Sequence, residues 1–259
     1  MSTSTKPKLS LITVCFNSEA TIEKTFASAM TQSYENIEYI VIDGQSTDRT
    51  LEIIEQYRSG IDVLVSEPDN GLYDAMNKGI DLASGEVIAF INSDDTFQTE
   101  DSVSRLMAPF EDTEVDCVYS DLVYVNNVNK IVRYWRSCPF RQGMFGKGWS
   151  PAHPTFYVRK KFYKILGGFN CQLQYGNDVD LMMRFLEKAK LKAVYVPRVS
   201  VRMLIGGVSN RSFKTIWVQN ASTISLAKQY GIPCNSFEYI FKKFYSRFTQ
   251  ILLRPKWGK

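Results

Sequence analysis

The sequence predicts an α/β sandwich built on a mostly parallel central sheet, and three observations indicate this fold. The chain has 259 residues, of which 44% are hydrophobic and 22% charged, as in a folded protein of one large domain or two small ones. Through the first hundred residues, short β-rich runs alternate with stretches of helical periodicity, which is the pattern of right-handed crossovers. Polar residues follow the ends of these strands, where open α/β sheets bind their ligands.

The expected elements of the first half follow from this alternation. Apolar β-rich runs predict strands over 9–16, 37–42, 61–65 and 87–91. Helices are expected between them: one capped by Ser18, one opening at Ser46-Thr47-Asp48 and one over 74–83.

Past residue 115 the pattern changes to shorter strands and longer helices. Strands are expected over 116–120, 122–125, 131–135, 155–158 and 193–196, and helices over 178–189, 213–229 and 236–253. We expect one domain over residues 1–210, with halves 1–115 and 116–210, followed by a helical extension over 211–259.

Composition excludes several classes of protein. No stretch approaches the roughly 18 apolar residues of a membrane span, and the polar first residues lack the apolar region of a signal peptide, so we expect a cytoplasmic protein. Five widely spaced cysteines without a C-x-x-C pair favour reduced thiols over a disulfide framework or zinc site. The single histidine, His153, excludes metal sites that need several imidazoles.

Charge is divided unevenly along the chain. Residues 1–130 carry 8 Lys and Arg against 23 Asp and Glu, a net of −15, whereas residues 131–259 carry 23 against 4, a net of +19. The basic half could face phosphates, an anionic membrane or nucleic acid, or the two halves could dock on each other. No basic-aromatic stretch or recognition helix is present, so a nucleic-acid partner is not expected.

Carboxylates at neighbouring strand ends predict a divalent cation. Asp94 and Asp95 follow a buried strand, and Asn17 and Asp43 follow two others. Such carboxylates repel one another unless a cation lies among them, and hard oxygen ligands select Mg²⁺ or Mn²⁺. The alternative is that Ser93-Asp94-Asp95-Thr96 only turns the chain. No Rossmann or P-loop glycine motif is present, which favours a nucleotide with a metal but without Walker chemistry.

Four motifs in order resemble those of family 2 glycosyltransferases. They are Leu11-Ile-Thr-Val-Cys-Phe-Asn17, Tyr39-Ile-Val-Ile-Asp-Gly-Gln-Ser-Thr-Asp48, Asn77-Lys-Gly79 and Phe90-Ile-Asn-Ser-Asp-Asp95. The resemblance covers roughly residues 8–205, and residues 67–79 are similar to bacterial members that build capsule, exopolysaccharide and O-antigen. It implies a GT-A fold, a UDP- or GDP-sugar donor, Mn²⁺ or Mg²⁺, and inversion at the anomeric carbon.

The resemblance also implies roles for residues of the nucleotide-binding half. Asp43 would accept a hydrogen bond from the base, Lys78 would lie near ribose or diphosphate, and Asp95 would ligate the metal. The remaining residues expected to contact the nucleotide sugar are Thr13, Asn17, Glu19, Ser93 and Asp94. The chain departs from the family at Gly44, where a second Asp is common, and at Ser93 of the D-x-D-like group.

The catalytic base is expected in the basic half, which holds four acids. Inverting transfer needs a carboxylate that takes the proton of the acceptor hydroxyl. In the family this is the Asp of a Glu-Asp pair that opens a helix, which Asn177-Asp178 matches with Asn in place of Glu. Asp178 is therefore the expected base, and Asp180 is the alternative. A purely structural interpretation is that Asn177 and Asp178 only cap the helix.

Three further residues have open interpretations. His153, between prolines, could reach the metal or a donor phosphate, or could stabilise its loop by hydrogen bonding. Trp149 could stack on a sugar or pack in the protein. Arg211 follows Gly206-Gly207 and could meet the diphosphate from a flexible lid.

The sequence of the tail predicts a basic amphipathic helix. Apolar residues recur at helical spacing from Phe237 to Leu252, beside six Lys and Arg and one acid, Glu238. This pattern indicates peripheral contact of residues 237–259 with an anionic membrane, at the inner face of the plasma membrane, or packing on the rest of the protein. Membrane contact would suit a lipid-linked oligosaccharide acceptor, with a soluble glycan as the other acceptor class.

Two alternative functions share the predicted site. One is a protein that binds a nucleotide sugar without turnover, and the other is a nucleotidyltransferase on a similar sandwich. Both would keep the strand-end carboxylates, but neither would need Asp178 as a base.

Overall fold

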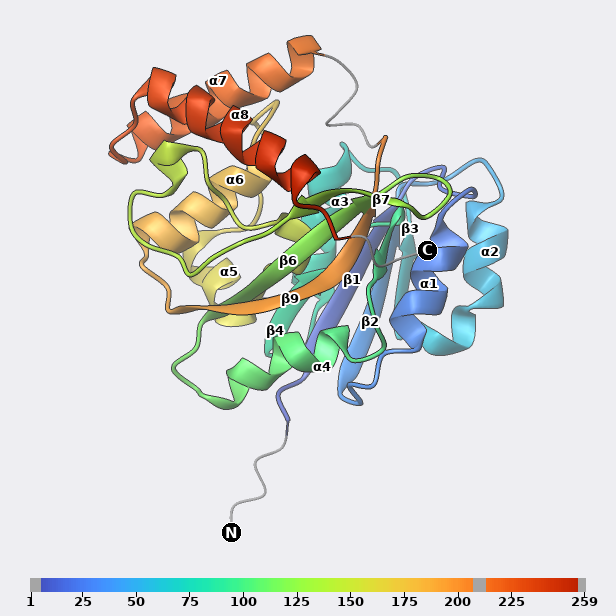
Figure 1. Cartoon of the computed structure of the whole chain (residues 1–259). Coiled ribbons are helices and arrows are strands. Elements are labelled where there is room, and N and C mark those ends of the chain that lie inside the picture. The colour runs from blue at the N-terminus through green and yellow to red at the C-terminus, as the bar shows by residue number, and fades with distance from the viewer. Residues whose placement is uncertain (1–5, 207–212, 256–259) are drawn as a thin grey trace.

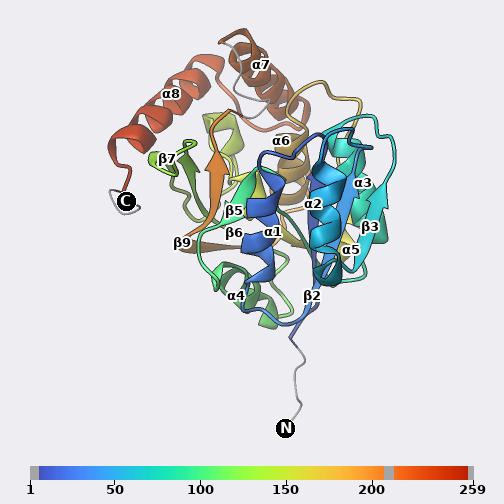
Figure 2. The same ribbon diagram turned by 90° about the vertical axis from the view of Figure 1, so that its right-hand side faces the viewer.

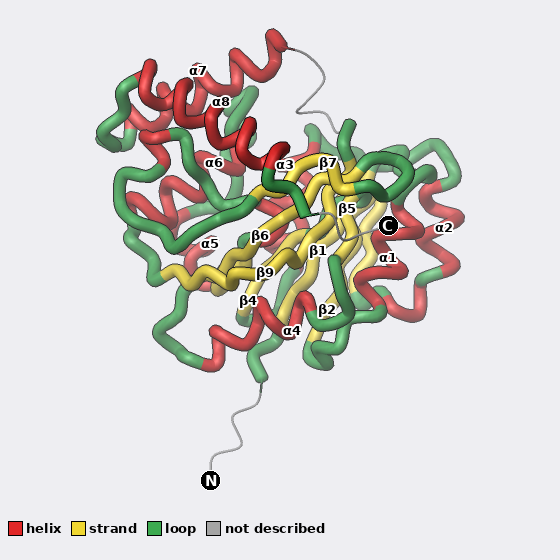
Figure 3. The backbone as a smooth tube through the Cα atoms, viewed as in Figure 1, coloured by secondary structure: helices red, strands yellow, loops and turns green. Residues whose placement is uncertain are grey.

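A computed structural model describes residues 6–206 and 213–255 of the chain. Its sheet has nine strands in the order β3-β2-β1-β4-β8-β6-β9-β5, and β7 pairs with β6 (Figures 1 and 3). β1–β4 form the parallel half, β6 and β9 are also parallel, and the remaining pairs are antiparallel. The strands are β1 (Leu9–Cys15), β2 (Ile37–Asp43), β3 (Val63–Ser66), β4 (Val87–Phe90), β5 (Asp95–Phe97), β6 (Cys117–Val125), β7 (Ile131–Trp135), β8 (Tyr157–Arg159) and β9 (Ala193–Leu204).

Helices cover both faces of this sheet. A π-helical stretch over Met183–Lys188 directly continues α6, and short 3₁₀ turns lie at Arg58–Gly60, Ala108–Glu111, Phe145–Lys147 and His153–Thr155. The α-helices are α1 (Ile22–Met30), α2 (Thr50–Gln56), α3 (Leu72–Leu82), α4 (Ser102–Met107), α5 (Lys160–Leu166), α6 (Asn177–Met182), α7 (Phe213–Gln229) and α8 (Ser236–Leu252).

The alternation of side chains along β1 explains the two cores. Leu9 and Leu11 point to one face, where they join a cluster with residues of α1, α2 and α4. Ile12 and Val14 point to the other face, where they join a cluster with residues of α3, α5, α6 and α7. Because both faces are covered, the strand is apolar throughout its length, as expected of a central parallel strand.

Glycine at position 79 allows α3 to lie close to the sheet. A Cβ atom there would be 2.6 Å from Cγ2 of Ile12 on β1. This close approach gives the Asn77-Lys-Gly79 motif a packing role in addition to any role at the site.

The α/β architecture agrees with the sequence prediction, but several elements differ. The two strands expected over 116–125 form one continuous strand, β6, and β9 continues eight residues past the expected end at 196. β5, α4 and α5 were not predicted, because runs of three to seven residues are too short for a periodicity.

The last two helices pack against the basic half of the chain. α7 contacts α6, and α8 contacts β7 and the 3₁₀ turn at 145–147. Figure 2 shows both helices at the end of the molecule opposite the N-terminus, beyond the carboxyl ends of the parallel strands. The division into domains at residue 210 stays a prediction.

Glu38 ties three strands together at the amino ends of the parallel sheet. Its carboxylate accepts hydrogen bonds from Ser10 Oγ at 2.5 Å, from Ser84 N at 2.7 Å and from Lys8 Nζ at 3.2 Å. Burial raises the pKa of this group, but the hydrogen bonds outweigh burial and bring it from 4.5 to about 2. The carboxylate is therefore more stable in the folded chain than in the unfolded one.

We expect Glu38→Gln to lower the free energy of unfolding by about 2 kcal/mol at pH 7, because charge-assisted hydrogen bonds are lost. Since the folded pKa lies below the unfolded one, this difference should be complete above pH 4.5 and vanish as the pH falls towards 2. Urea unfolding from pH 7 to pH 2.5 measures it, with the exposed Glu35→Gln as control. A difference that does not change with pH would contradict this role.

Candidate functional site

The polar strand ends lie together on one edge of the sheet. β1 is flanked by β2 and β4, with Cys15 opposite Asp43 and Ile12 opposite Phe90. The segments that follow these strands therefore meet. They contain Asn17, Asp43 and the run from Asn92 to Asp95, which were predicted to form the site.

Asp43 holds the loop that follows β2. Its carboxylate accepts hydrogen bonds from Ser46 N at 3.0 Å, Ser46 Oγ at 2.5 Å and Ser66 Oγ at 2.7 Å. The residue is 0% exposed. The structure therefore does not present Asp43 to a base at the surface, and its carboxylate instead fixes the loop on which a nucleotide would lie.

Asn17 and Glu19 join the first loop to the second. Asn17 adopts a left-handed conformation with φ 47°, and its Oδ1 accepts a hydrogen bond from Thr47 N at 2.9 Å. Glu19 accepts from Arg49 N at 3.0 Å, and its own N donates to Asp48. Both side chains thus bridge the loops, on the exposed side of the strand ends.

The other predicted nucleotide contacts are placed differently. Thr13 is fully buried within β1 and hydrogen-bonds the hydroxyl of Tyr39 at 2.9 Å, so its side chain does not reach a cleft. Lys78 pairs with Glu67 at 2.9 Å and donates to the carbonyl of Pro68. Ser93 lies 2.9 Å from Ser18, which connects the loop after β4 to the first loop.

Asp94 and Asp95 lie in different surroundings. Asp94 lines a cleft of about 500 Å³ between α1 and the ends of β6 and β9. Asp95 is buried beside it, and Asn92 Nδ2 lies 3.4 Å from one of its oxygens. Burial and, in second place, the charge of Asp94 raise the pKa of Asp95 well above its usual range.

Two buried oxygens at this point lack partners. Oδ1 of Asn92 and Oδ1 of Asp95 accept no hydrogen bond from the described residues. Buried oxygens without donors are costly, and hard oxygen ligands of this kind suit Mg²⁺ or Mn²⁺. Within residues 6–206 and 213–255, no group of three His, Cys, Asp or Glu residues is close enough to hold a metal. Asn92 and Asp95 thus fit a cation that takes most of its ligands from elsewhere, such as from phosphate oxygens.

Asp178 lies in the first turn of α6 and is only partly buried. The hydroxyl of Tyr73, at the start of α3, lies near the backbone N–H of Asp178. No described residue forms a hydrogen bond or ion pair with its carboxylate.

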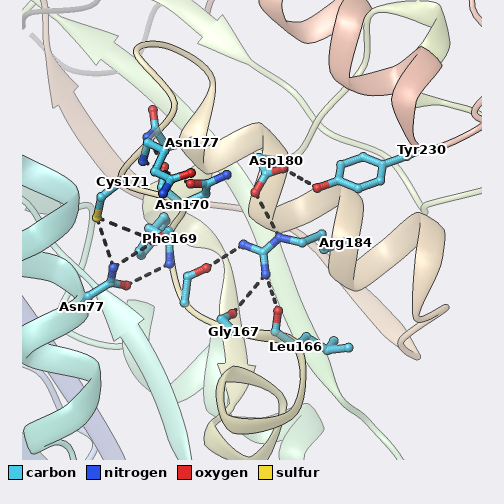
Figure 4. A network of polar contacts seen from close by, with 12 residues as sticks. Asn77, Leu166, Gly167, Phe169, Asn170, Cys171, Asn177, Asp180, Arg184 and Tyr230 are labelled. Atoms are coloured by element: carbon cyan, nitrogen blue, oxygen red, sulfur yellow. Dashed lines mark hydrogen bonds and ion pairs between the residues drawn. The ribbon is translucent and has the colours of Figure 1, made fainter.

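Asp180 has a structural role instead, which corrects its place as the alternative base. Its carboxylate pairs with Arg184 Nε at 3.0 Å and accepts from Tyr230 Oη at 2.5 Å (Figure 4). Arg184 also donates to the carbonyl oxygens of Leu166, Gly167 and Gly168. Asp180 is therefore committed to holding α6 against the end of α5.

Asn177 and Asn77 anchor the segment before α6. Asn177 Nδ2 donates to the carbonyls of Asn170 and Leu173, whereas Asn77 on α3 exchanges two hydrogen bonds with the backbone of Phe169 (Figure 4). Asn177, which replaces the Glu of the family pattern, thus fixes the loop rather than supplying a charge.

His153 lies between two aromatic rings near Asp178. It stacks on Phe90 with ring centroids 5.7 Å apart and meets Phe169 edge-on at 5.5 Å. Burial lowers the pKa of His153, and the charge of Asp178 opposes this shift. The structure thus places the imidazole of His153 near the carboxylate of the expected base.

Trp149 and Arg211 complete the predicted residues. The Trp149 ring lies among Tyr119, Phe140 and Phe145, so packing accounts for its position. Arg211 falls outside the described residues.

Sequence reasoning missed several residues of the site. Tyr73 lies within residues 67–79 but was given no role of its own, and Phe169 belongs to no motif. Tyr124 is buried on β6, yet the charges of both Asp95 and Asp178 act on it. The charges that act on Tyr124 thus come from residues far apart in the sequence, which only the tertiary packing brings together.

We expect Asp180→Ala to lower the free energy of unfolding by about 3 kcal/mol, because it leaves the partly buried guanidinium of Arg184 without its carboxylate. Asp178→Ala, two residues earlier, should change stability by less than about 1 kcal/mol, since only the helix-dipole interaction is lost. Urea unfolding of both variants measures the difference. Equal losses would show that Asp178 also has a structural role.

Comparison with known proteins gives relatives along the whole chain. A "PGL/p-HBAD biosynthesis glycosyltransferase" of Mycobacterium bovis is 27% identical over 79% of this chain and 80% of its own length. The "Putative glycosyltransferase EpsE" of Bacillus subtilis is 26% identical over 98% of this chain and 94% of its own.

Solved structures show the same fold. The TarS protein of S. aureus, in a complex with UDP, has a TM-score of 0.65 at 21% identity, over 96% of this chain and 76% of its own. The mannosyltransferase PcManGT of Pyrobaculum calidifontis, in a complex with GDP-Man and Mn²⁺, has a TM-score of 0.63 at 18% identity, over 94% and 70%. The predicted GT-A fold is thereby confirmed.

The family description "Glycosyl transferase family 2" matches residues 10–167, which include β1 to β8 and the strand-end site. This match covers more than half of the chain, and it agrees with the order of the motifs and the names of the relatives. The chain belongs to glycosyl transferase family 2 and is a glycosyltransferase.

Proposed function

We propose that this glycosyltransferase moves a sugar from a UDP- or GDP-sugar to a hydroxyl of a glycan or lipid-linked oligosaccharide acceptor in surface polysaccharide synthesis, with inversion. One observation carries the proposal. Of the four acids in residues 131–259, Asp180 pairs with Arg184, Glu187 accepts from Gly143 N and Glu238 pairs with Lys242. Only Asp178 has a carboxylate without a partner among the described residues.

Asp178 would act as the general base. The acceptor oxygen attacks the anomeric carbon, the bond from that carbon to the diphosphate breaks, and the hydroxyl proton passes to Asp178. His153 and Tyr73 would shape the space around it, as positioning residues.

The loops after β1, β2 and β4 would bind the nucleotide. Asn17, Glu19 and Ser93 lie on the bridged loops, and Lys78 would reach the ribose or diphosphate by leaving Glu67. Asp43 and Thr13 would act from behind as positioning residues, since neither is exposed. The neighbouring structures bound to UDP and GDP-Man make uridine and guanosine the first nucleotides to examine.

Asn92, Asp94 and Asp95 would hold a divalent cation together with the diphosphate. The unpartnered oxygens of Asn92 and Asp95 support this placement. When bound, the metal would supply positive charge that stabilises the leaving diphosphate. PcManGT was solved with Mn²⁺, which is the first ion to test here.

The outer face of α8 would contact the membrane. Five aromatic side chains on this helix are between 58% and 82% exposed: Phe237, Phe241, Phe244, Tyr245 and Phe248. An apolar patch of this kind on a helix with basic residues fits an anionic lipid surface. A cleft of about 360 Å³ between α7 and α8, lined by Trp217 and Ile240, extends the same surface. No described helix is long and apolar enough to cross a bilayer.

The proposed transfer is tested by incubating the protein with UDP- and GDP-sugars, Mn²⁺ and lipid-linked acceptor from a bacterial membrane extract, and by measuring sugar incorporation and free nucleotide. Asp178→Asn should reduce transfer about 10²- to 10⁴-fold, the usual contribution of a general base, and leave donor binding unchanged. Undiminished transfer in this variant would overturn the base assignment. Donor binding without transfer in the wild type would favour a binding protein.

The metal site is tested by thermal unfolding with UDP or GDP in the presence of MnCl₂ or EDTA. We expect Mn²⁺ with nucleotide to raise the melting temperature of the wild type, because both bind the folded chain. Asp95→Asn and Asp94→Asn should lose most of this increase, whereas the exposed Asp81→Asn should keep it. An unchanged increase in Asp95→Asn would remove this residue from the ligand set.

The membrane contact is tested by sedimentation with vesicles of phosphatidylglycerol and phosphatidylcholine. Changing Phe241, Phe244 and Phe248 together to Ser should weaken binding at least roughly tenfold, because each inserted ring contributes on the order of 1 kcal/mol or more. Ile165→Ser, an exposed apolar residue on α5, is the matched control. Equal binding of both variants would exclude the outer face of α8 as the contact.

A further inference from the structure

Three cationic side chains lie on α8 and on β7, the strand that α8 contacts. Arg133 belongs to β7, and Lys243 and Arg247 belong to α8; all three are partly buried. We call them the inner cation cluster. In Figure 1, α8 passes above β7, and the two elements are in contact.

Two of these side chains are held in place by neighbours. The guanidinium of Arg133 lies 4.6 Å from the ring centroid of Tyr124, and its Nε donates to Gln250 at 2.6 Å. The ammonium of Lys243 donates to the hydroxyl of Tyr239 at 2.8 Å. Fixed cations of this kind form a preorganised surface for an anion.

The inner cation cluster lacks an anionic partner in the described part of the chain. None of its three members forms an ion pair there, and Asp178 is the one carboxylate whose charge acts on Lys243. Burial first, and then the charge of Arg247, lower the pKa of Lys243 to about 8, and the same two causes lower the pKa of Arg133. Partly buried charges are normally paired, so the cluster is incomplete without an anion.

The cluster adjoins the space between the two groups of carboxylates. Tyr124, whose ring lies under Arg133, is affected by the charges of Arg247, Asp95 and Asp178 together. An anion bound here would therefore lie on the Asp178 side of the site, on elements of the basic half. The strand-end loops and their cation are built from the other half of the chain.

We propose that Arg133, Lys243 and Arg247 bind a phosphate or diphosphate group of the acceptor and so hold its hydroxyl beside Asp178. This inference rests on the proposed function. A phosphate matches the cluster because arginine pairs with it through two parallel hydrogen bonds and lysine acts as a point charge. A lipid diphosphate acceptor would also explain why α8 carries Lys243 and Arg247 on its inner side and exposed aromatic rings on its outer side.

The test is calorimetric binding of pyrophosphate and of farnesyl diphosphate to the intact protein, already saturated with Mn²⁺ and with UDP or GDP. We expect both probes to bind the wild type. Lys243→Gln and Arg247→Gln should weaken binding at least tenfold, and Arg247→Lys should restore part of it. The matched control is Lys242→Gln, the adjacent residue on α8, which is exposed and paired with Glu238.

Three results would overturn the proposal. If saturation with nucleotide and Mn²⁺ abolishes pyrophosphate binding, the cluster belongs to the donor diphosphate site. If the variants lose binding only to phosphatidylglycerol vesicles, the anion is a membrane lipid. If Lys242→Gln weakens binding as much as Lys243→Gln, no specific site exists.

Melting temperatures of all variants confirm that each is folded. Because the assay measures binding without sugar transfer, failure of Asp178 as the base would leave its result unaffected. Conversely, intact transfer with no binding of either probe would overturn this inference alone.

Discussion

The ion pair between Asp180 and Arg184 fixes α6, and the proposed acceptor side of the site, around Asp178, depends on this contact. Arg184 donates to a carbonyl at the end of α5 and so joins α6 to α5. The same guanidinium forms the ion pair with the buried carboxylate of Asp180. Side chains two positions apart on a helix point in directions about 200° apart, so Asp178 faces the opposite way. The Asp180–Arg184 ion pair thus holds one side of α6. The carboxylate of Asp178 on the other side stays free of protein partners among the described residues, close to His153 and Tyr73.

The donor side is built by hydrogen bonds between loops. Asp43 fixes the second loop, Asn17 and Glu19 join it to the first, and Ser93 joins the first to the fourth. Because these hydrogen bonds already order the loops, a ligand that binds them loses less free energy to ordering, which is the physical basis of preorganisation. The exception is the pair of unpartnered oxygens of Asn92 and Asp95, which is where we propose that a cation binds.

α8 combines two kinds of surface that ordinary packing does not require. Its Lys243 and Arg247 are partly buried, and its outer side exposes a row of aromatic rings. The sequence showed a basic amphipathic helix, with membrane contact and core packing as alternatives. In the structure Tyr239 is the buried residue of this helix, so packing accounts for one side only. The two surfaces together are what an amphiphilic anionic acceptor would need.

The sequence by itself determined the α/β class, the order of most elements and the family, because buried strands, helical periodicity and the motif spacing are local properties of the chain. It also singled out Asp178 and the strand-end acids. The tertiary structure alone decided that Asp180 is committed to Arg184, that Thr13 and Asp43 are buried, and that β6 is one strand. It also brought Tyr124 and Lys243 close enough to Asp178 for its charge to act on them. Burial and pairing depend on contacts between residues far apart in the sequence, such as Arg133 with Gln250, which are 117 positions apart, and no local pattern contains them.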